Sequence, residues 1–136
     1  MKQLCVLLIL SLIIMPGNSM AQNKIERKEL LLAPIGSRTI STVDIKEVTM
    51  PPGQKGAYHN HPCPVVGHVV SGSVLFQVEG DSAKVLKAGE AFYEPAGTPI
   101  VHFDNASETK PLKFIAYYLL NGEKELIKLL PEKSNK

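Results

Sequence analysis

Short runs in which apolar and polar residues alternate recur along the chain, and glycine or proline separates most of them. Side chains of a strand point alternately to its two faces, so this alternation predicts strands that are buried on one side. Regular short strands with turn residues between them are typical of all-β sandwiches and barrels. We therefore predict an all-β fold, with strands over residues 39–49, 65–70, 73–79, 83–87, 91–94, 100–104 and 112–120.

The same alternation predicts which side chains form the core. One apolar residue at every second position of a strand should face inward. We expect a core made by these residues, or by their strand neighbours if the facing is reversed: Val43, Ile45, Val69, Leu75, Phe92, Phe114 and Ala116.

The segment Glu123–Leu130 leaves its element open, because periodicity over so few positions does not separate a short helix from a last strand. No internal repeat interrupts the chain, and one domain is natural for its length. We expect a single domain over residues 22–136, with a short polar N-terminal arm (Gln22–Glu29) and a C-terminal tail.

The first 21 residues have the pattern of a secretory signal peptide. Lys2 precedes an apolar run from Leu4 to Met15, and Ser19-Met20-Ala21 supplies small residues for cleavage. The apolar run is too short to span a bilayer comfortably. We expect cleavage after Ala21, export to the periplasm or the medium, and no membrane span in the mature chain.

Charge and cysteine content narrow the possible partners. The formal net charge is +2, and no basic stripe is present, which argues against binding of nucleic acid. Cys5 lies in the predicted signal peptide, so Cys63 has no partner for an intrachain disulfide. A lone thiol in an exported protein is buried, paired between chains or reactive. We favour a buried thiol, although Cys63 follows His61 closely enough to face the same site.

A pair of histidines, His59 and His61, gives the clearest sign of chemistry. On a strand, residues two apart point to the same face. Neutral imidazoles that converge on one face can hold a metal ion. A His-x-His pair alone is a weak motif, and the glycines around this one make it more specific.

The residues around this pair resemble the first motif of the cupin superfamily, Gly-x5-His-x-His-x3-Glu-x6-Gly. Gly53, His59, His61 and Gly72 fall on its spacing. The resemblance implies a jelly-roll β-barrel of the small, single-domain type 2 group, similar to RmlC-like proteins.

The second cupin motif, Gly-x5-Pro-x-Gly-x2-His-x3-Asn, is also recognisable. Gly89, Pro95 and Gly97 fall on its spacing, and Asn105 comes one residue late. The two motifs together cover Gly53–Asn105, and the flanking strands extend the likeness over most of the mature chain.

Two positions depart from the family pattern. Val65 stands where the first motif has its glutamate, and Ile100 stands where the second has its histidine. His102 lies two residues after Ile100 and shares its face on a regular strand. We therefore expect His59, His61 and His102 to bind the metal together. The alternative is that His102 lines the barrel and is hydrogen-bonded to water.

The fourth histidine, His68, has the opposite parity. If Val65 faces inward, as the family glutamate does, His68 faces outward and belongs to a packed interface rather than to a metal site. A bulge caused by Pro62 and Pro64 would reverse this facing and bring His68 into the site.

Three imidazoles favour a divalent transition metal, with zinc, iron, nickel, copper and manganese all as candidates. The resemblance implies a metal-dependent oxygenase or isomerase-like enzyme that acts on a small oxygenated or aromatic molecule. Glu94 and Tyr93 are the nearest candidates for a general base. The alternative is a non-catalytic cupin that binds a small ligand and has a degraded or absent metal site. The sequence does not decide whether there is turnover.

Self-association is a further expectation. The outer sheet of a small barrel has edges that need covering. Members of the family commonly pair by exchanging edge strands. We therefore expect a homodimer.

Overall fold

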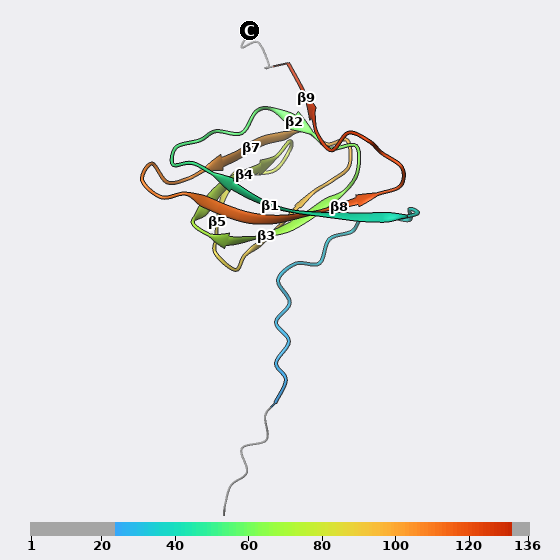
Figure 1. Ribbon diagram of the computed structural model, residues 1–136, viewed down its shortest axis with the longest axis horizontal. Coiled ribbons are helices and arrows are strands. Elements are labelled where there is room, and N and C mark those ends of the chain that lie inside the picture. Colours follow the sequence, from blue (N-terminus) through green and yellow to red (C-terminus); the bar gives the residue numbers. More distant parts are fainter. Residues whose placement is uncertain (1–23, 132–136) are drawn as a thin grey trace, which may run out of the picture.

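The structure is a computed structural model that describes residues 24–131, so the predicted signal peptide (residues 1–21) lies outside the described residues. Within the described range the chain forms two antiparallel sheets and no helix (Figure 1). The strands are β1 (Thr42–Met50), β2 (His59–Asn60), β3 (Val65–Ser71), β4 (Ser73–Val78), β5 (Lys84–Lys87), β6 (Ala91–Glu94), β7 (Ile100–Asn105), β8 (Leu112–Leu120) and β9 (Lys128–Leu129). The predicted all-β fold is confirmed, and the C-terminal element that the sequence left open is the short strand β9.

The strand order is that of a jelly roll. One sheet has the order β1-β8-β3-β6, and the other has the order β5-β4-β7-β2-β9. The tight turn between β3 and β4 carries the chain from the first sheet to the second. Gly72 makes this turn possible, because its φ is 80° and a Cβ there would come within 2.6 Å of the Pro111 carbonyl oxygen.

Four phenylalanine rings hold the two sheets together. Phe76 and Phe103 come from one sheet, and Phe92 and Phe114 come from the other. Neighbouring centroids are 4.7 Å apart for Phe103 and Phe114, and 5.1 Å apart for Phe92 and Phe103. Offset and edge-on contacts at these distances are favourable for aromatic rings and add to the burial of their area.

Most of the predicted core is confirmed. Val69, Phe92, Phe114 and Ala116 are buried, and on β4 the neighbours of Leu75 are buried in its place. The prediction was wrong for Val43 and Ile45, which are 50% and 58% exposed. They lie on the edge strand β1, whose other face packs Val48 and Met50 against the core.

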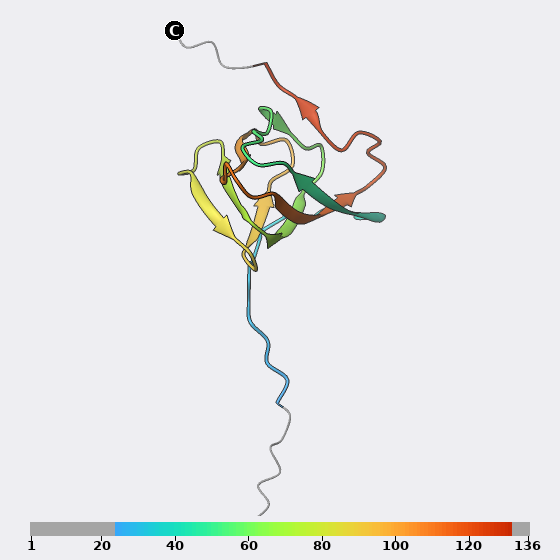
Figure 2. The same cartoon turned by 60° about the vertical axis from the view of Figure 1, so that its left-hand side comes forward.

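Cys63 is fully buried, as expected, and burial raises the pKa of its thiol. Cys63 is therefore an unreactive core residue. Residues 24–37 form an extended arm (Figures 1 and 2), and several side chains between residues 28 and 35 line a hollow together with the four-stranded sheet. Within residues 24–131, no helix is long and apolar enough to cross a membrane.

Candidate metal centre

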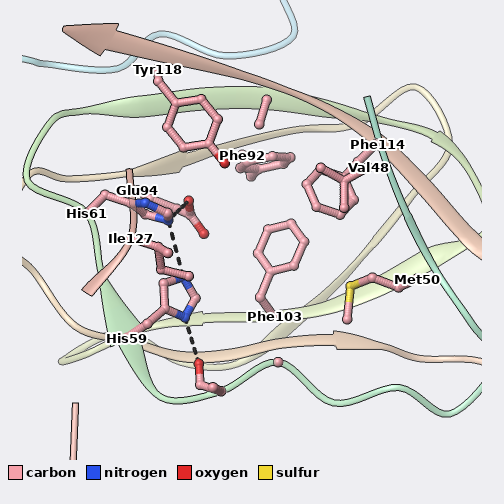
Figure 3. A pocket seen from close by; sticks show the side chains of 13 residues that line it. Val48, Met50, His59, His61, Phe92, Glu94, Phe103, Phe114, Tyr118 and Ile127 are labelled. Carbon is pink, nitrogen blue, oxygen red and sulfur yellow. Dashed lines mark hydrogen bonds and ion pairs between the residues drawn. The ribbon is translucent and has the colours of Figure 1, made fainter. Parts of the chain in front are cut away.

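A cavity of about 210 Å³ lies between the two sheets. Figure 3 shows its two unlike ends: polar side chains gather at one end, and apolar side chains fill the other. The polar residues are His59, His61 and Glu94. The remaining residues of the lining are Val48, Met50, Gly56, Ala57, Phe92, Phe103, Phe114, Ala116, Tyr118 and Ile127.

The structure brings His59 and His61 together at the polar end, as the sequence predicted. Both side chains are buried, and the two Nε2 atoms are 3.2 Å apart. Nδ1 of His59 donates to the carbonyl oxygen of Ala57 at 2.6 Å, and Nδ1 of His61 donates to the carbonyl oxygen of Leu126. A carbonyl oxygen only accepts, so each Nδ1 carries a proton and each neutral ring has its lone pair on Nε2.

Two Nε2 lone pairs that face each other at this distance need a positive partner. A proton can supply it on one ring, and a metal ion can supply it for both. Backbone carbonyls that bind the outer nitrogen of a histidine are the usual support for a metal-bound imidazole. The hydrogen bonds of His59 and His61 therefore suit a pair of metal ligands.

Glu94 completes the cluster. Its Oε2 lies 3.0 Å from Nε2 of His61, and both side chains are at most 5% exposed. One ligand atom from each of His59, His61 and Glu94 lies within 4.8 Å of the others. Ligands about 2.1 Å from a tetrahedral ion are roughly 3.4 Å apart, so the donor set fits a divalent transition metal with little movement.

Two neighbouring pKa values are displaced by this environment. Burial alone lowers the pKa of His61, but the hydrogen bond and charge of Glu94, with the Leu126 carbonyl, outweigh it and raise the pKa above its ordinary value. Burial, followed by the charge of Glu94, raises the pKa of Tyr118 to about 12. Tyr118 is therefore a protonated phenol beside the cluster, and it can donate a hydrogen bond but not act as a base.

The expectation that His102 joins His59 and His61 does not agree with the structure. A bulge on β7 separates the pair Gln77–His102 from the pair Val78–Ile100, so one extra residue, Val101, lies between them. A bulge reverses the facing of the residues beyond it. Ile100 is accordingly buried, whereas the side chain of His102 is 41% exposed and lies outside the cavity.

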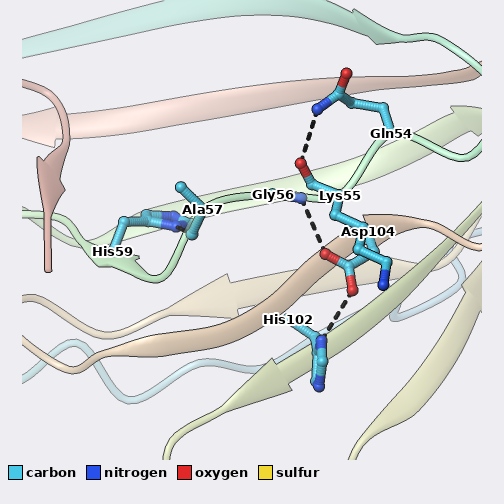
Figure 4. Close-up of polar contacts among 7 residues, drawn as sticks. All are labelled: Gln54, Lys55, Gly56, Ala57, His59, His102 and Asp104. Atoms are coloured by element: carbon cyan, nitrogen blue, oxygen red, sulfur yellow. Dashed lines mark hydrogen bonds and ion pairs between the residues drawn. The ribbon is translucent and has the colours of Figure 1, made fainter. Parts of the chain in front are cut away.

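His102 instead binds a carboxylate on the far side of β7 (Figure 4). Its Nδ1 donates to Oδ2 of Asp104 at 2.8 Å, and the other oxygen of Asp104 accepts from the backbone nitrogen of Gly56 at 2.9 Å. Gly56 precedes Ala57, whose carbonyl orients the His59 ring. Asp104 therefore holds in place the loop at Gly56 and Ala57, which orients the candidate ligand His59.

His68 lies on the outer face of the four-stranded sheet. Its ring stacks on Tyr117, with centroids 6.3 Å apart, next to residues of the N-terminal arm. This placement agrees with the outward facing expected from strand parity. Within residues 24–131, the cluster of candidate metal ligands does not include His68.

The sequence pointed to Glu94 only as a candidate base. The family spacing places its carboxylate at position 65, which is a valine here, and the rest of that strand contains no aspartate or glutamate. The antiparallel pairing of β3 with β6 sets Glu94 directly opposite Val65. Residues paired in this way have side chains on the same face, which explains why a distant glutamate reaches the site.

Known proteins resemble this chain in sequence pattern and in fold. The sequence profile of the family described as Cupin domain matches residues 46–123, more than half of the chain. No curated protein matches the sequence.

Similar solved structures include the DMSP lyase DddQ from Ruegeria pomeroyi DSS-3, with a TM-score of 0.58 and 22% identity over 68% of this chain and 45% of the lyase. Oxalate oxidase in complex with glycolate has a TM-score of 0.54 and 24% identity over 65% of this chain and 46% of the oxidase. A cupin-like protein from Thermotoga maritima has a TM-score of 0.56 and 23% identity over 65% of this chain and 64% of that protein. The chain thus spans less than half of the lyase and of the oxidase, and at these identities the likeness shows the fold.

Proposed function

This chain belongs to the cupin domain family, and from that premise we propose that it binds one divalent transition metal through His59, His61 and Glu94. The observation that carries the proposal is the pair of Nε2 atoms 3.2 Å apart, one of them 3.0 Å from a buried carboxylate oxygen. Two imidazoles and one carboxylate suit zinc, iron, manganese, nickel or copper better than calcium or magnesium. Three protein ligands leave further positions for a small molecule.

The proposed activity is metal-dependent turnover of a small oxygen-bearing molecule. The metal, when bound, would supply Lewis acidity to an oxygen of that molecule. Hydrogen bonds to backbone carbonyls hold the rings of His59 and His61 in the orientation that points Nε2 at the metal position. The apolar side chains of the cavity exclude water from this position. Tyr118, a protonated phenol at the edge of the cluster, can donate a hydrogen bond to the bound molecule. The solved neighbours, an oxidase and a lyase by name, support a catalytic role for a cavity of this kind.

A non-catalytic ligand-binding cupin is the second candidate. It is favoured by one observation: the titratable groups that line the cavity, other than Tyr118, all belong to the proposed ligand set. An enzyme that moves a proton needs a base that is not fully occupied by the metal.

The experiment that separates the two measures metal and turnover on the same sample. Elemental analysis of the protein purified from its native compartment should give about one transition metal per chain. Oxygen consumption with catechol-type and diketone substrates then tests an oxygenase. Bound metal without turnover of any probe would favour the binding protein, and absence of metal would overturn the proposed site.

We also propose that the protein is a homodimer joined through the outer face of the four-stranded sheet. Val43 and Ile45 expose apolar surface on this face, and the arm beside it exposes Leu30 and Leu32, which are 52% and 82% accessible. Residues 28–31 of the arm, with His68, already line a hollow on the same face. A second copy, placed by two-fold symmetry, would cover the arm and the face together.

Sedimentation at micromolar concentration tests the dimer. Val43→Asp should give a monomer, because it places a charge in the interface. Val85→Asp is the matched control, since Val85 is equally exposed, at 50%, but lies on β5 in the other sheet. A monomeric wild type, or equal effects of the two variants, would contradict this arrangement.

Export is proposed from the sequence pattern of residues 1–21. Amino-terminal sequencing of the native protein should begin at Gln22. An intact Met1 would contradict cleavage.

A further inference from the structure

The division of the cavity into a polar and an apolar end says what kind of molecule fits it. All three ligand candidates lie at one end, and the far end is formed by Val48, Met50 and the rings of Phe103 and Phe114 (Figure 3). Among the described residues that line the cavity there is no lysine or arginine, and Tyr118 has the one hydroxyl group. A carboxylate at the far end would therefore have no cationic side chain to pair with.

Burial of an unpaired charge is far more costly than loss of a hydrogen bond. The cavity consequently discriminates by the number and position of charges on a ligand. One oxygen-bearing group can bind the metal and accept a hydrogen bond from Tyr118. A second charged group, directed away from the metal, would meet Phe103, Phe114 and Met50.

The volume sets the size of the apolar body. An apolar cavity of about 150 Å³ is large enough for benzene, and this one measures about 210 Å³. The space beyond a single ring is enough for a few more atoms, which would include the group at the metal. Ile127 also lines the cavity, and its side chain is 49% exposed. The part of the cavity wall that Ile127 forms is therefore apolar as well.

We propose that the ligand of this cavity is a compact amphipathic molecule, with one oxygen-bearing end at the metal and a single apolar or aromatic ring against Phe92, Phe103 and Phe114. This inference rests on the proposed metal site, whose occupant it specifies. It separates this protein from cupins that accept small doubly charged anions, because the far end offers no cation to a second carboxylate.

Three carboxylates that differ by one feature each test the inference on the zinc-loaded protein. Acetate has the head group alone, benzoate adds the ring, and terephthalate adds a second carboxylate at the far end of the ring. Calorimetric titration should give benzoate a Kd at least tenfold lower than that of acetate or terephthalate. Acetate or terephthalate binding as tightly as benzoate would overturn the inference.

Two variants place the ring in the cavity. Ala116 is buried and lines it, so Ala116→Leu should abolish the advantage of benzoate over acetate while zinc stays bound. Ala106→Leu is the matched control, because Ala106 is exposed on the surface. Met50→Lys, at a partly exposed position, should give terephthalate at least tenfold tighter binding by supplying the missing cation. Terephthalate binding unchanged by Met50→Lys would contradict the proposed orientation, whether or not Ala116→Leu folds.

Zinc content measured on every sample distinguishes failure of the proposed metal site from failure of the proposed ring site. If zinc does not bind, the proposed function falls, and toluene replaces benzoate as the probe of the metal-free cavity. Toluene binding that Ala116→Leu abolishes would then support the apolar ring site, and no toluene binding would overturn it.

Discussion

Glu94 on β6 lies directly opposite Val65 on β3 in the antiparallel pairing of these strands. Both side chains are buried, at 3% and 1% exposure, and both belong to the face that looks into the barrel. The cupin motif has its glutamate at the position of Val65. In this chain the carboxylate reaches the same end of the cavity from the neighbouring strand.

Ile100 has a similar relationship to His59. It is the cross-strand partner of His59, and it stands where the second cupin motif has a histidine. Ile100→His should add an imidazole beside His59 and tighten zinc binding at least tenfold, about 1.4 kcal/mol. Zinc titration in the presence of a competing chelator measures this change. An affinity equal to that of the wild type would show that position 100 does not face the metal.

Asp104 is expected to act on the site through the loop before His59. Asp104→Ala removes the acceptor for Gly56 N and for His102 Nδ1, and it should weaken zinc binding by loosening the carbonyl that orients His59. Asp104→Asn keeps an oxygen for Gly56 and should restore most of the affinity. His102→Ala is the control for the other half of the contact and should leave zinc binding unchanged. Equal affinities for wild type and Asp104→Ala would rule out this positioning role.

Tyr118 makes stability depend on pH at the alkaline end. Its pKa is raised from 10.0 to about 12 in the folded chain, so the folded state holds a proton that the unfolded state loses. The contribution is fully present below pH 10 and is lost as the pH rises toward 12. The stability advantage of wild type over Tyr118→Phe should therefore shrink between pH 10 and 12, by at most about 1.4 kcal/mol per pH unit. Urea unfolding at several pH values measures it, and a constant difference would contradict the burial of this phenol.

Gly67 allows Phe92 to pack against β8. A Cβ at this position would lie 2.3 Å from both the Ile115 carbonyl oxygen and Cζ of Phe92. Gly67→Ala should cost at least about 3 kcal/mol of unfolding free energy, at the upper end for overpacking, since backbone is one of the obstacles. Gly97→Ala is a useful control, because its Cβ meets open space and only the φ of 74° is unfavourable. Similar losses in urea unfolding for both variants would mean that the core gives way around position 67.

The strand segments and the first two ligands could be predicted from the sequence, and the reason lies in local pattern. His59 and His61 are separated by a single residue, so strand parity alone sets them on one face. His102 could not be placed in this way, because parity between Ile100 and His102 holds only on a regular strand. The bulge at Val101 depends on how β7 pairs with β4, which no local pattern records.

Glu94 was beyond a local prediction for the same reason. Its relation to Val65 is a pairing between β3 and β6, separated by the β4–β5 hairpin along the chain. The exposure of Val43 and Ile45 is also a matter of partners: both alternate correctly with polar neighbours, but the face that the edge strand buries is the one with Val48 and Met50. Sequence pattern predicts which residues share a face, and pairing decides which face is inside.

The most direct test of the central claim is the zinc affinity of a carboxylate exchange between Glu94 and Val65, measured by calorimetric titration. Glu94→Gln should weaken binding at least tenfold, about 1.4 kcal/mol. The double variant Val65→Glu/Glu94→Gln should recover most of that loss, because the carboxylate returns to the same face from the opposite strand. His102→Ala should bind zinc as the wild type does. Wild-type affinity in Glu94→Gln, together with loss of binding in His102→Ala, would contradict the ligand set of His59, His61 and Glu94.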